Sequence, residues 1–340
     1  MKLKVQFACV YCSKRPVNLK ATALSVAFLW TFTLSCEKYT NRSNNKMSSS
    51  NQKSQLHALG FLILAMLSVQ SSASLAKILF QNFPVLTVSA MRLCLGAIIL
   101  AFIFKIWRIN YSQVRWKAIL AYGFALAGMN ALFYLSIERL PIGIAVAFEF
   151  IGPLSVALYH ARQKYDFVWV SLAIVGLVLL FPFYQAHSLD WIGVLFAVSA
   201  GACWALYIIA GQKPSGISGN HTVCLGMTVG ACVLLPITFF SGSMGQVIEL
   251  PYLFYFIGLA ILASALPFSL EMLALRNLTP LSFGTLMSLE PAVAALSGFI
   301  FLGEYLLWNQ WLALATIIAA SVGCTITTQK ARQEREKTVS

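Results

Sequence analysis

The sequence predicts an all-α polytopic membrane protein with ten transmembrane helices, arranged as two inverted repeats of five helices. Of its 340 residues, 59% are hydrophobic and only 10% are charged, and the mean hydropathy is +0.77. A soluble domain has about 25% charged residues, and a soluble fold of this length could not bury so much apolar surface. Apolar stretches of membrane-spanning length also follow one another along the chain, and Lys and Arg gather in alternate gaps between them.

The apolar stretches are each long enough to cross about 30 Å of hydrocarbon at a helical rise of 1.5 Å per residue. The gaps between them are short, and several contain a proline, as at Pro84, Pro141, Pro251 and Pro280. The expected spans cover residues 58–80, 85–106, 118–137, 142–160, 167–184, 191–211, 221–241, 252–275, 280–301 and 305–327.

The basic residues predict the orientation of these spans, because Lys and Arg favour cytoplasmic gaps. If the segment before the first span is cytoplasmic, the cytoplasmic gaps and the tail hold 13 basic residues and the outer gaps hold only Arg139. Both termini of the spanning region are therefore expected in the cytoplasm. The 13 residues are Lys53, Lys105, Arg108, Arg115, Lys117, Arg162, Lys164, Lys213, Arg276, Lys330, Arg332, Arg335 and Lys337.

The two halves of the spanning region repeat each other. A shift of 138 positions aligns Leu140 with Leu278 and Pro153 with Pro291, and it also aligns residues 157 and 158 with 295 and 296. Because each half holds five spans, the second half must insert upside down, as in many secondary transporters. We therefore expect one repeat over 57–184, a second over 191–328, and a basic cytoplasmic tail over 329–340.

Residues 1–46 differ from the rest of the chain. They hold eight of the 24 basic residues, and their apolar run, 21–36, is short for a span. A signal peptide is one interpretation, because a basic start precedes an apolar core. We favour the other, in which Met47 is the true start and residues 1–46 are an amino-terminal extension that is absent from the native protein.

Five ionisable residues lie within the expected spans: Lys77, Arg92, Glu149, Glu271 and Glu290. Burying such groups in a bilayer is costly, so they usually face a cavity or each other. Lys77 and Glu271 are near span ends, where Lys77 can snorkel and Glu271 can be a boundary residue beside Arg276. Arg92, Glu149 and Glu290 lie deeper and are candidates for substrate binding or coupling. Their alternative role is a buried ion pair that locks helices together.

Polar and aromatic residues in other spans complete the candidate site. Asn130 and Tyr134 share a helix face, as do Trp204 and Tyr207. Aromatic residues in spans more often pack or face lipid, so the two pairs are weaker candidates. Gln70, Ser71, Ser72 and Ser74 line the first span, and Gly226 and Gly230 form a helix-packing motif.

Enzyme classes find no support in the sequence. It contains no metalloprotease, serine hydrolase or nucleotide-binding motif. Cys9 and Cys12 form a single C-x-x-C pair without the second pair that a zinc site needs. We expect no metal, no cofactor and no catalytic residue. The net charge of +13 reflects topology rather than nucleic-acid binding.

Two motifs resemble the drug/metabolite transporter superfamily of the EamA type. The stretch from Ser288 to Glu304, SLEPAVAALSGFIFLGE, is similar to the ninth-span signature of that superfamily, and Ala90-Met-Arg92-Leu is similar to its second span. The resemblance covers about residues 59–329, which is both repeats. Within the superfamily, residues 73–77, 140–153 and 266–272 resemble bacterial inner-membrane exporters of small neutral amino acids.

The resemblance implies a secondary transporter that exports threonine- or homoserine-like amino acids, by exchange with protons, across a bacterial inner membrane. An exporter of drugs or other metabolites with the same fold is the alternative, and an intramembrane enzyme or a structural membrane protein is less expected. We further expect Arg92 to pair with Glu149 when the site is empty and with the substrate carboxylate when it is occupied. Glu290 is the expected proton-coupling group, with Glu149 or Glu271 as the alternatives. The oligomeric state is left open.

Overall fold

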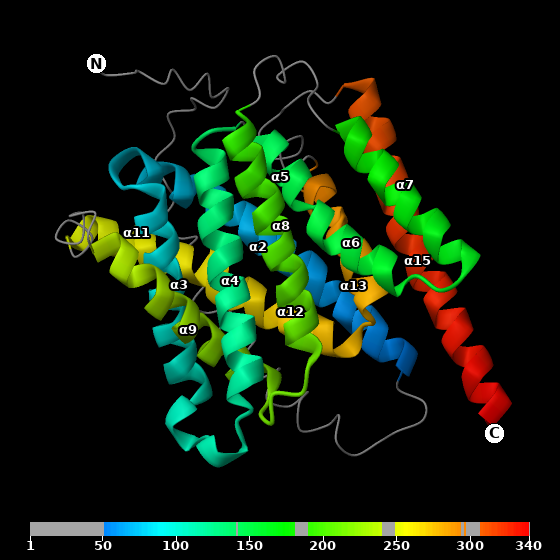
Figure 1. Cartoon of the computed structure of the whole chain (residues 1–340), viewed down its shortest axis with the longest axis horizontal. Coiled ribbons are helices and arrows are strands. Elements are labelled where there is room, and N and C mark those ends of the chain that lie inside the picture. The colour runs from blue at the N-terminus through cyan, green and yellow to red at the C-terminus, as the bar shows by residue number, and fades with distance from the viewer. Residues whose placement is uncertain are drawn as a thin grey trace. The chain divides into compact units, whose positions relative to one another are not determined.

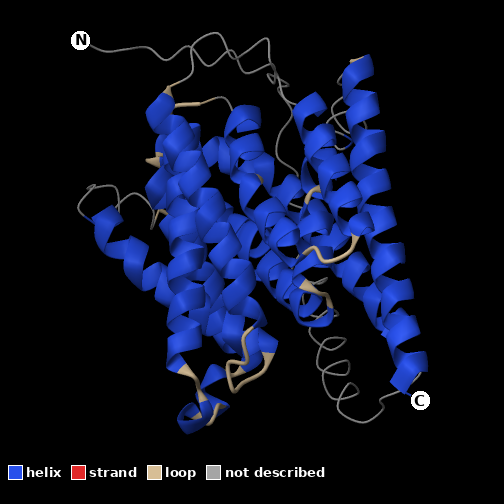
Figure 2. Ribbon diagram, turned by 45° about the vertical axis from the view of Figure 1, so that its right-hand side comes forward, coloured by secondary structure: helices blue, strands red, loops and turns tan. Residues whose placement is uncertain are grey.

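The computed structural model is helical throughout the residues that it describes, which are 51–140, 142–180, 190–239, 249–293, 296 and 307–339 (Figures 1 and 2). The chain divides into two units, Met1–Asn44 and Asn45–Ser340, and every described residue belongs to the second. The predicted extension over 1–46, including its expected end before Met47, therefore lies outside the described residues and stays a prediction.

The helices follow the order of the expected spans. Short 3₁₀ turns, η1 (Ile106–Arg108) and η2 (Tyr111–Gln113), connect two of them, and a π-helical segment, η4 (Ile261–Ala265), interrupts a third. The α-helices are α2 (Asn51–Asn82), α3 (Val85–Phe104), α4 (Trp116–Ile137), α5 (Ile142–Glu149), α6 (Ile151–His160), α7 (Lys164–Leu180), α8 (Trp191–Gln212), α9 (Gly219–Phe239), α11 (Leu250–Ala260), α12 (Leu266–Asn277), α13 (Pro280–Met287) and α15 (Trp308–Val339).

Among the described residues, five helical segments are long and apolar enough to cross a membrane. They are Val85–Phe104, Trp116–Ile137, Trp191–Gln212, Gly219–Pro236 and Tyr252–Asn277. Shorter apolar helices cover His57–Ser72 and Ile144–His160. The prediction of an all-helical membrane protein is confirmed at this level.

The span expected at 280–301 is interrupted at Ser288, directly after α13, and two further expected spans are not continuous α-helices. The span expected at 142–160 breaks at Phe150, between α5 and α6, because Pro153 has no N–H to bond the carbonyl of Glu149 four residues earlier. The span expected at 252–275 contains the π-helical segment η4, and Pro267 follows it in the first turn of α12. Prolines inside apolar runs therefore mark both irregularities.

Packing of distant segments builds the helical unit. Helix α4 lies against α8, α3 against α9, α2 against α12, and α7 against α15. Figure 1 shows the last pair side by side. The predicted packing role of Gly226 and Gly230 is confirmed, because Gly226 contacts the ring of Tyr122 on α4 and Gly230 lies beside Gly123 of the same helix.

Candidate functional site

Arg92 is the centre of a polar cluster between α3, α4 and η4. Its Nη1 donates to the carbonyl oxygen of Ala263 at 3.3 Å, and its Nη2 donates to Oδ1 of Asn130. Its guanidinium carbon also lies 5.2 Å from the centre of the Tyr134 ring, a cation–π arrangement. The expectation that Asn130 and Tyr134 share a face of one helix is confirmed, and Arg92 is the residue that they meet.

Local sequence explains why Arg92 finds these partners. In a regular α-helix the N–H of residue 267 would bond the Ala263 carbonyl, but Pro267 has none. That carbonyl can therefore accept from Arg92. On α4, Nδ2 of Asn130 donates to the Leu126 carbonyl at 2.8 Å, so its Oδ1 is left to face the guanidinium.

Unused hydrogen-bonding atoms remain around Arg92. Its Nε is buried without a partner, and so are the hydroxyl groups of Ser89, one turn earlier on α3, and Ser264, next to Ala263. Gly96 lets α3 approach α9, because a β-carbon there would lie 2.5 Å from Cε of Met227, and it would be in ordinary contact with Cβ of Ser264 at 3.4 Å. An unpaired buried polar group costs about 1–3 kcal/mol, so a polar ligand that bonded these three groups would recover that cost.

Two carboxyl groups lie near this cluster, one at each helix break. Glu149 is the last residue of α5 and is 8% exposed. The helix is interrupted at Ser288, directly after α13, and Glu290 lies two residues after that interruption. Glu149 is close enough to both Arg92 and Glu290 to interact electrostatically with them. The candidate residues Arg92, Glu149 and Glu290 are thus brought together.

The direct ion pair that we expected between Arg92 and Glu149 is not formed. Among the described residues, the ion pair present joins Arg139 and Asp190 at 3.0 Å, at the ends of α4 and α8. Arg92 instead bonds Asn130 and the Ala263 carbonyl, because these acceptors lie beside it on α4 and η4. The Arg92–Glu149 prediction is wrong for this conformation.

Glu271 is not the boundary residue that its position near a span end suggested. It is 9% exposed, and the hydroxyl of Tyr207 donates to its Oε2 at 3.1 Å. It is also within electrostatic range of Glu290. Arg276 contacts other groups, donating to the hydroxyls of Ser215 and Thr222 and to the Ile217 carbonyl.

The remaining candidates have no described contact with Arg92, Glu149 or Glu290. Trp204 packs its ring edge-on against Phe150, with centres 5.0 Å apart, and so holds the break between α5 and α6. Gln70 is half-buried on α2. Ser71 and Ser72 bond carbonyls of their own helix. Lys77 and Ser74 belong to α2, but their side chains lie outside the described part of the chain.

Four residues of the region escaped the sequence reasoning: Ser68, Ser89, Ser264 and Tyr122. Ser68 donates to the Leu262 carbonyl at 2.7 Å, across from α2 to η4. Pro267 was the available signal for the Ala263–Ser264 stretch, because a proline in an apolar run frees carbonyls one turn earlier. Nothing in the periodicity of α4 distinguishes Tyr122 from an ordinary packing residue.

Comparison with known proteins identifies the family of the chain. The EamA-like transporter family matches residues 191–326. The threonine/homoserine exporter RhtA of Escherichia coli (strain K12) is 48% identical over 280 residues, which is 81% of this chain and 93% of that protein. The chain belongs to the EamA-like transporter family. RhtA of Salmonella typhimurium (strain LT2) is 47% identical over 277 residues, with the same two coverages.

More distant EamA-like relatives match part of the chain. The uncharacterized inner membrane transporter YedA of Escherichia coli (strain K12) is 24% identical over 197 residues, 56% of this chain and 63% of that one. A solved crystal structure covers 82% of this chain and 99% of its own, with a TM-score of 0.63 and 15% identity, and so supports the fold. The chain is a membrane transporter with a small-molecule substrate and not an enzyme, as the sequence predicted.

Proposed function

We propose that this transporter exports small neutral amino acids such as threonine and homoserine, in exchange for protons. The observation that carries the proposal is the gathering of buried Glu149 and half-buried Glu290, each at a helix break, near half-buried Arg92 of α3. A zwitterion needs a cation for its carboxylate and an anion for its ammonium, and this cluster offers both. The similarity to RhtA, a threonine/homoserine exporter to which the chain is 48% identical, supports the same substrate class.

The substrate carboxylate would bind between α3 and η4. There the Nε of Arg92 and the hydroxyls of Ser89 and Ser264 are buried donors without partners. A carboxylate accepts charge-assisted bonds from a guanidinium more strongly than neutral acceptors do. The ammonium would then face Glu149 or Glu290. An exporter of cationic drugs would have no use for the Arg92 donors.

We infer a topology of ten spans in two inverted repeats, over 57–184 and 191–328, with both ends in the cytoplasm of a bacterial cell and the protein in its inner membrane. The breaks support the repeat. Phe150 and Ser288 are 138 positions apart and have nearly the same backbone angles, φ −63° and ψ −14° against φ −63° and ψ −12°. Each precedes a proline by three residues. Two unrelated apolar helices would not be expected to break at corresponding positions with nearly the same backbone angles.

Helix packing supports the same symmetry. If each span in the first half corresponds to the span five places later, the contacts of α3 with α9 and of α7 with α15 lie on the symmetry axis. The contact of α4 with α8 then corresponds to that of α12 with α2. Inverted repeats place a substrate site near the membrane midplane, between the repeats, and in this topology Arg92 and the two acids would lie there.

Transport by the purified full-length chain in liposomes tests this proposal. We expect threonine and homoserine to move when a pH gradient is imposed, and cationic dyes to stay. Burial favours the neutral form of a carboxyl group, so Glu290 can take up and release a proton, and Glu290→Gln should abolish gradient-driven transport of a folded protein. Unchanged gradient dependence in that variant would transfer the coupling role to Glu149 or Glu271. Preference for a substrate of another class would overturn the amino-acid assignment.

A further inference from the structure

A second polar group of residues lies between the central acids and the end of α12. It consists of Glu271 on α12, Tyr207 on α8 and Tyr122 on α4. Each is five or six residues from the helix end that the proposed topology places in the cytoplasm, or about 8–9 Å at 1.5 Å per residue. Glu290 is ten residues beyond the start of α13, about 15 Å deep.

The contacts within this group form a chain. The Tyr207 hydroxyl donates to Oε2 of Glu271 at 3.1 Å. The rings of Tyr122 and Tyr207 lie 4.8 Å apart with their planes tilted by 32°. Both rings are fully buried, and the Tyr122 hydroxyl has no hydrogen-bond partner. A buried phenol without a partner is costly, and here it lies beside a bonded phenol and carboxyl group.

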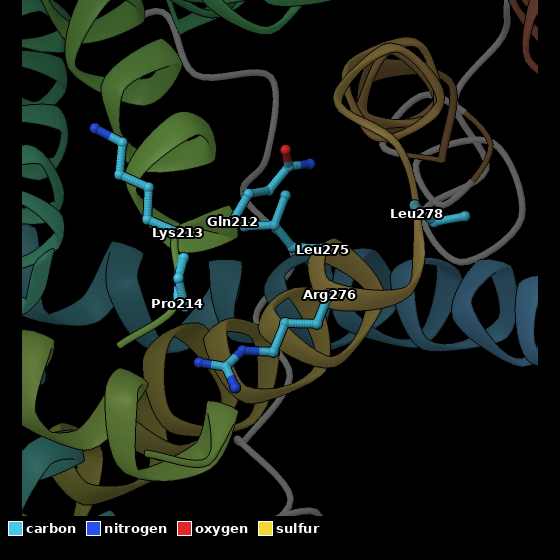
Figure 3. Close-up of a pocket in the computed structure, with 6 residues that line it drawn as sticks. All are labelled: Gln212, Lys213, Pro214, Leu275, Arg276 and Leu278. Carbon is cyan, nitrogen blue, oxygen red and sulfur yellow. The ribbon is translucent and has the colours of Figure 1, made fainter. Parts of the chain in front are cut away.

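An open pocket of about 380 Å³ lies between the ends of α8 and α12, near this group of residues (Figure 3). Gln212 and Lys213 line it from α8, and Leu275 and Arg276 line it from α12. Tyr122 contacts Gly211, the neighbour of the pocket residue Gln212, because a β-carbon on Gly211 would be 3.4 Å from Cε2 of Tyr122. The Gln212 amide nitrogen is also buried without a partner.

Other titratable groups near Glu271 are few among the described side chains. Helix α12 packs against α2, α8, α9, η4 and α13. Of these, α8 contributes Tyr207, and His221 of α9 is bonded to Ser218 and to the Phe104 carbonyl. Glu290 acts on Glu271 from the central site, and Arg276 on the same helix is bonded to Ser215 and Thr222. The described residues therefore leave Tyr207 as the hydroxyl bonded to Glu271.

We propose that Glu271, Tyr207 and Tyr122 form a proton relay that connects the central acids to water in the pocket between α8 and α12. This inference rests on the proposed proton antiport. In export, protonated Glu271 gives its proton to the Tyr207 oxygen, while Tyr207 passes its own hydroxyl proton to Tyr122 and Tyr122 passes its proton to water. Glu271 becomes a carboxylate, both phenols stay neutral, and one hydronium forms in the pocket. Neither tyrosine binds substrate.

Two transport assays separate this relay from a structural role. The full-length chain in liposomes is assayed for threonine transport driven by a pH gradient, and for threonine counterflow at equal pH. In counterflow the transporter carries substrate in both directions, exchanging one threonine for another. It therefore never has to bind or release a proton. Tyr207→Phe and Tyr122→Phe keep the rings and remove only the hydroxyls. Tyr252→Phe is the matched control. Tyr252 lies on α11 and packs against Phe83, away from the relay.

We expect both relay variants to lose at least about tenfold in gradient-driven transport and to keep counterflow within about twofold, with the control unchanged in both. An equal loss in the two assays, or no loss in either, would overturn the relay. A wild-type chain with counterflow but no gradient-driven transport would overturn proton antiport itself, and the relay with it. Gradient-driven transport that is equal in wild type and Tyr207→Phe would overturn the relay alone.

Discussion

At the scale of single residues, Arg92 is a permanent charge held by neutral partners. A guanidinium cannot lose its proton to lower the cost of burial, and here Asn130, the Ala263 carbonyl and the Tyr134 ring surround it. None of these neutralises its charge. The site is therefore prepared for an anion, and a substrate carboxylate can bind without first displacing a carboxylate of the protein.

Substitution of Arg92 tests this role. Arg92→Lys keeps the charge but loses the planar arrangement of donors, so we expect a folded protein whose apparent affinity for threonine falls about tenfold or more. Arg92→Gln should abolish transport. Binding of threonine, measured by calorimetry on the purified variants, checks the expectation. Wild-type affinity in Arg92→Gln would show that Arg92 is structural, and Asn82→Gln, at the exposed end of α2, is a control for amide substitution.

At the scale of elements, the break between α5 and α6 is possible because two glycines face each other. The backbone of Gly152 on α6 contacts that of Gly201 on α8, and a β-carbon on Gly201 would lie 2.5 Å from the Glu149 carbonyl oxygen. That carbonyl is the one that Pro153 leaves without its helical donor. Close packing of α8 thus covers the break and positions Glu149.

Gly201→Ala should therefore force α5 and α6 away from α8. We expect a loss of about 1–3 kcal/mol of stability, the usual cost of overpacking, together with reduced transport. Gly60→Ala is the matched control, because a β-carbon at Gly60 meets nothing within 4 Å and alanine favours helix. Thermal unfolding in detergent checks both variants, and equal melting temperatures for Gly201→Ala and Gly60→Ala would contradict the tight contact.

The ion pair of Arg139 and Asp190 ties the end of α4 to the start of α8. The hydrogen bond from Arg139, followed by that from the Ile192 N–H, lowers the pKa of Asp190 below its usual 3.8. A carboxyl group whose pKa is lowered by folding stabilises the folded state above its unfolded pKa, and this contribution is lost as the pH falls through the folded pKa. The pair should therefore be intact throughout the physiological range.

A double-mutant cycle measures that pair. Arg139→Gln and Asp190→Asn remove one charge each, and Asn keeps a side-chain acceptor for the cap of α8. We expect a small favourable coupling at neutral pH, because both side chains are partly exposed, and its disappearance in acid as the pH falls through the lowered pKa of Asp190. Coupling that persists in acid would show that the contact does not depend on the Asp190 charge.

At the scale of the whole molecule, the asymmetry of basic residues predicts which ends of the helices face the cytoplasm. The connection between α3 and α4 carries exposed basic residues, whereas the corresponding end of α4 and start of α8 have only Arg139, already paired. Lys and Arg resist translocation across the inner membrane. In the topology that we propose, the pocket between α8 and α12 is cytoplasmic, which is the direction that the proton relay requires.

Accessibility from the two sides checks the topology. In a background without the native cysteines, we expect Ser112→Cys in η2 to react with a membrane-impermeant maleimide only in inverted vesicles. Glu249 is an exposed position before α11. Glu249→Cys should react with the same reagent only in spheroplasts, in which the outer face of the inner membrane is accessible. Labelling of both sites from the same side would contradict the inverted arrangement.

The sequence by itself determined the class of molecule and the positions of the helices in the described part of the chain, and it predicts a repeat. Hydropathy and Lys/Arg placement act through the bilayer, independently of which helix packs on which, so they can be interpreted locally. The helix breaks were also within reach, since Pro153 and Pro267 act on carbonyls of their own helices. The tertiary structure alone decided that Arg92 bonds Asn130 rather than Glu149, and that Tyr207 bonds Glu271. Helix depth places such residues at one level, but which of them touch depends on helix rotation and close approach at glycines such as Gly201, and these are set by packing between segments far apart in the chain.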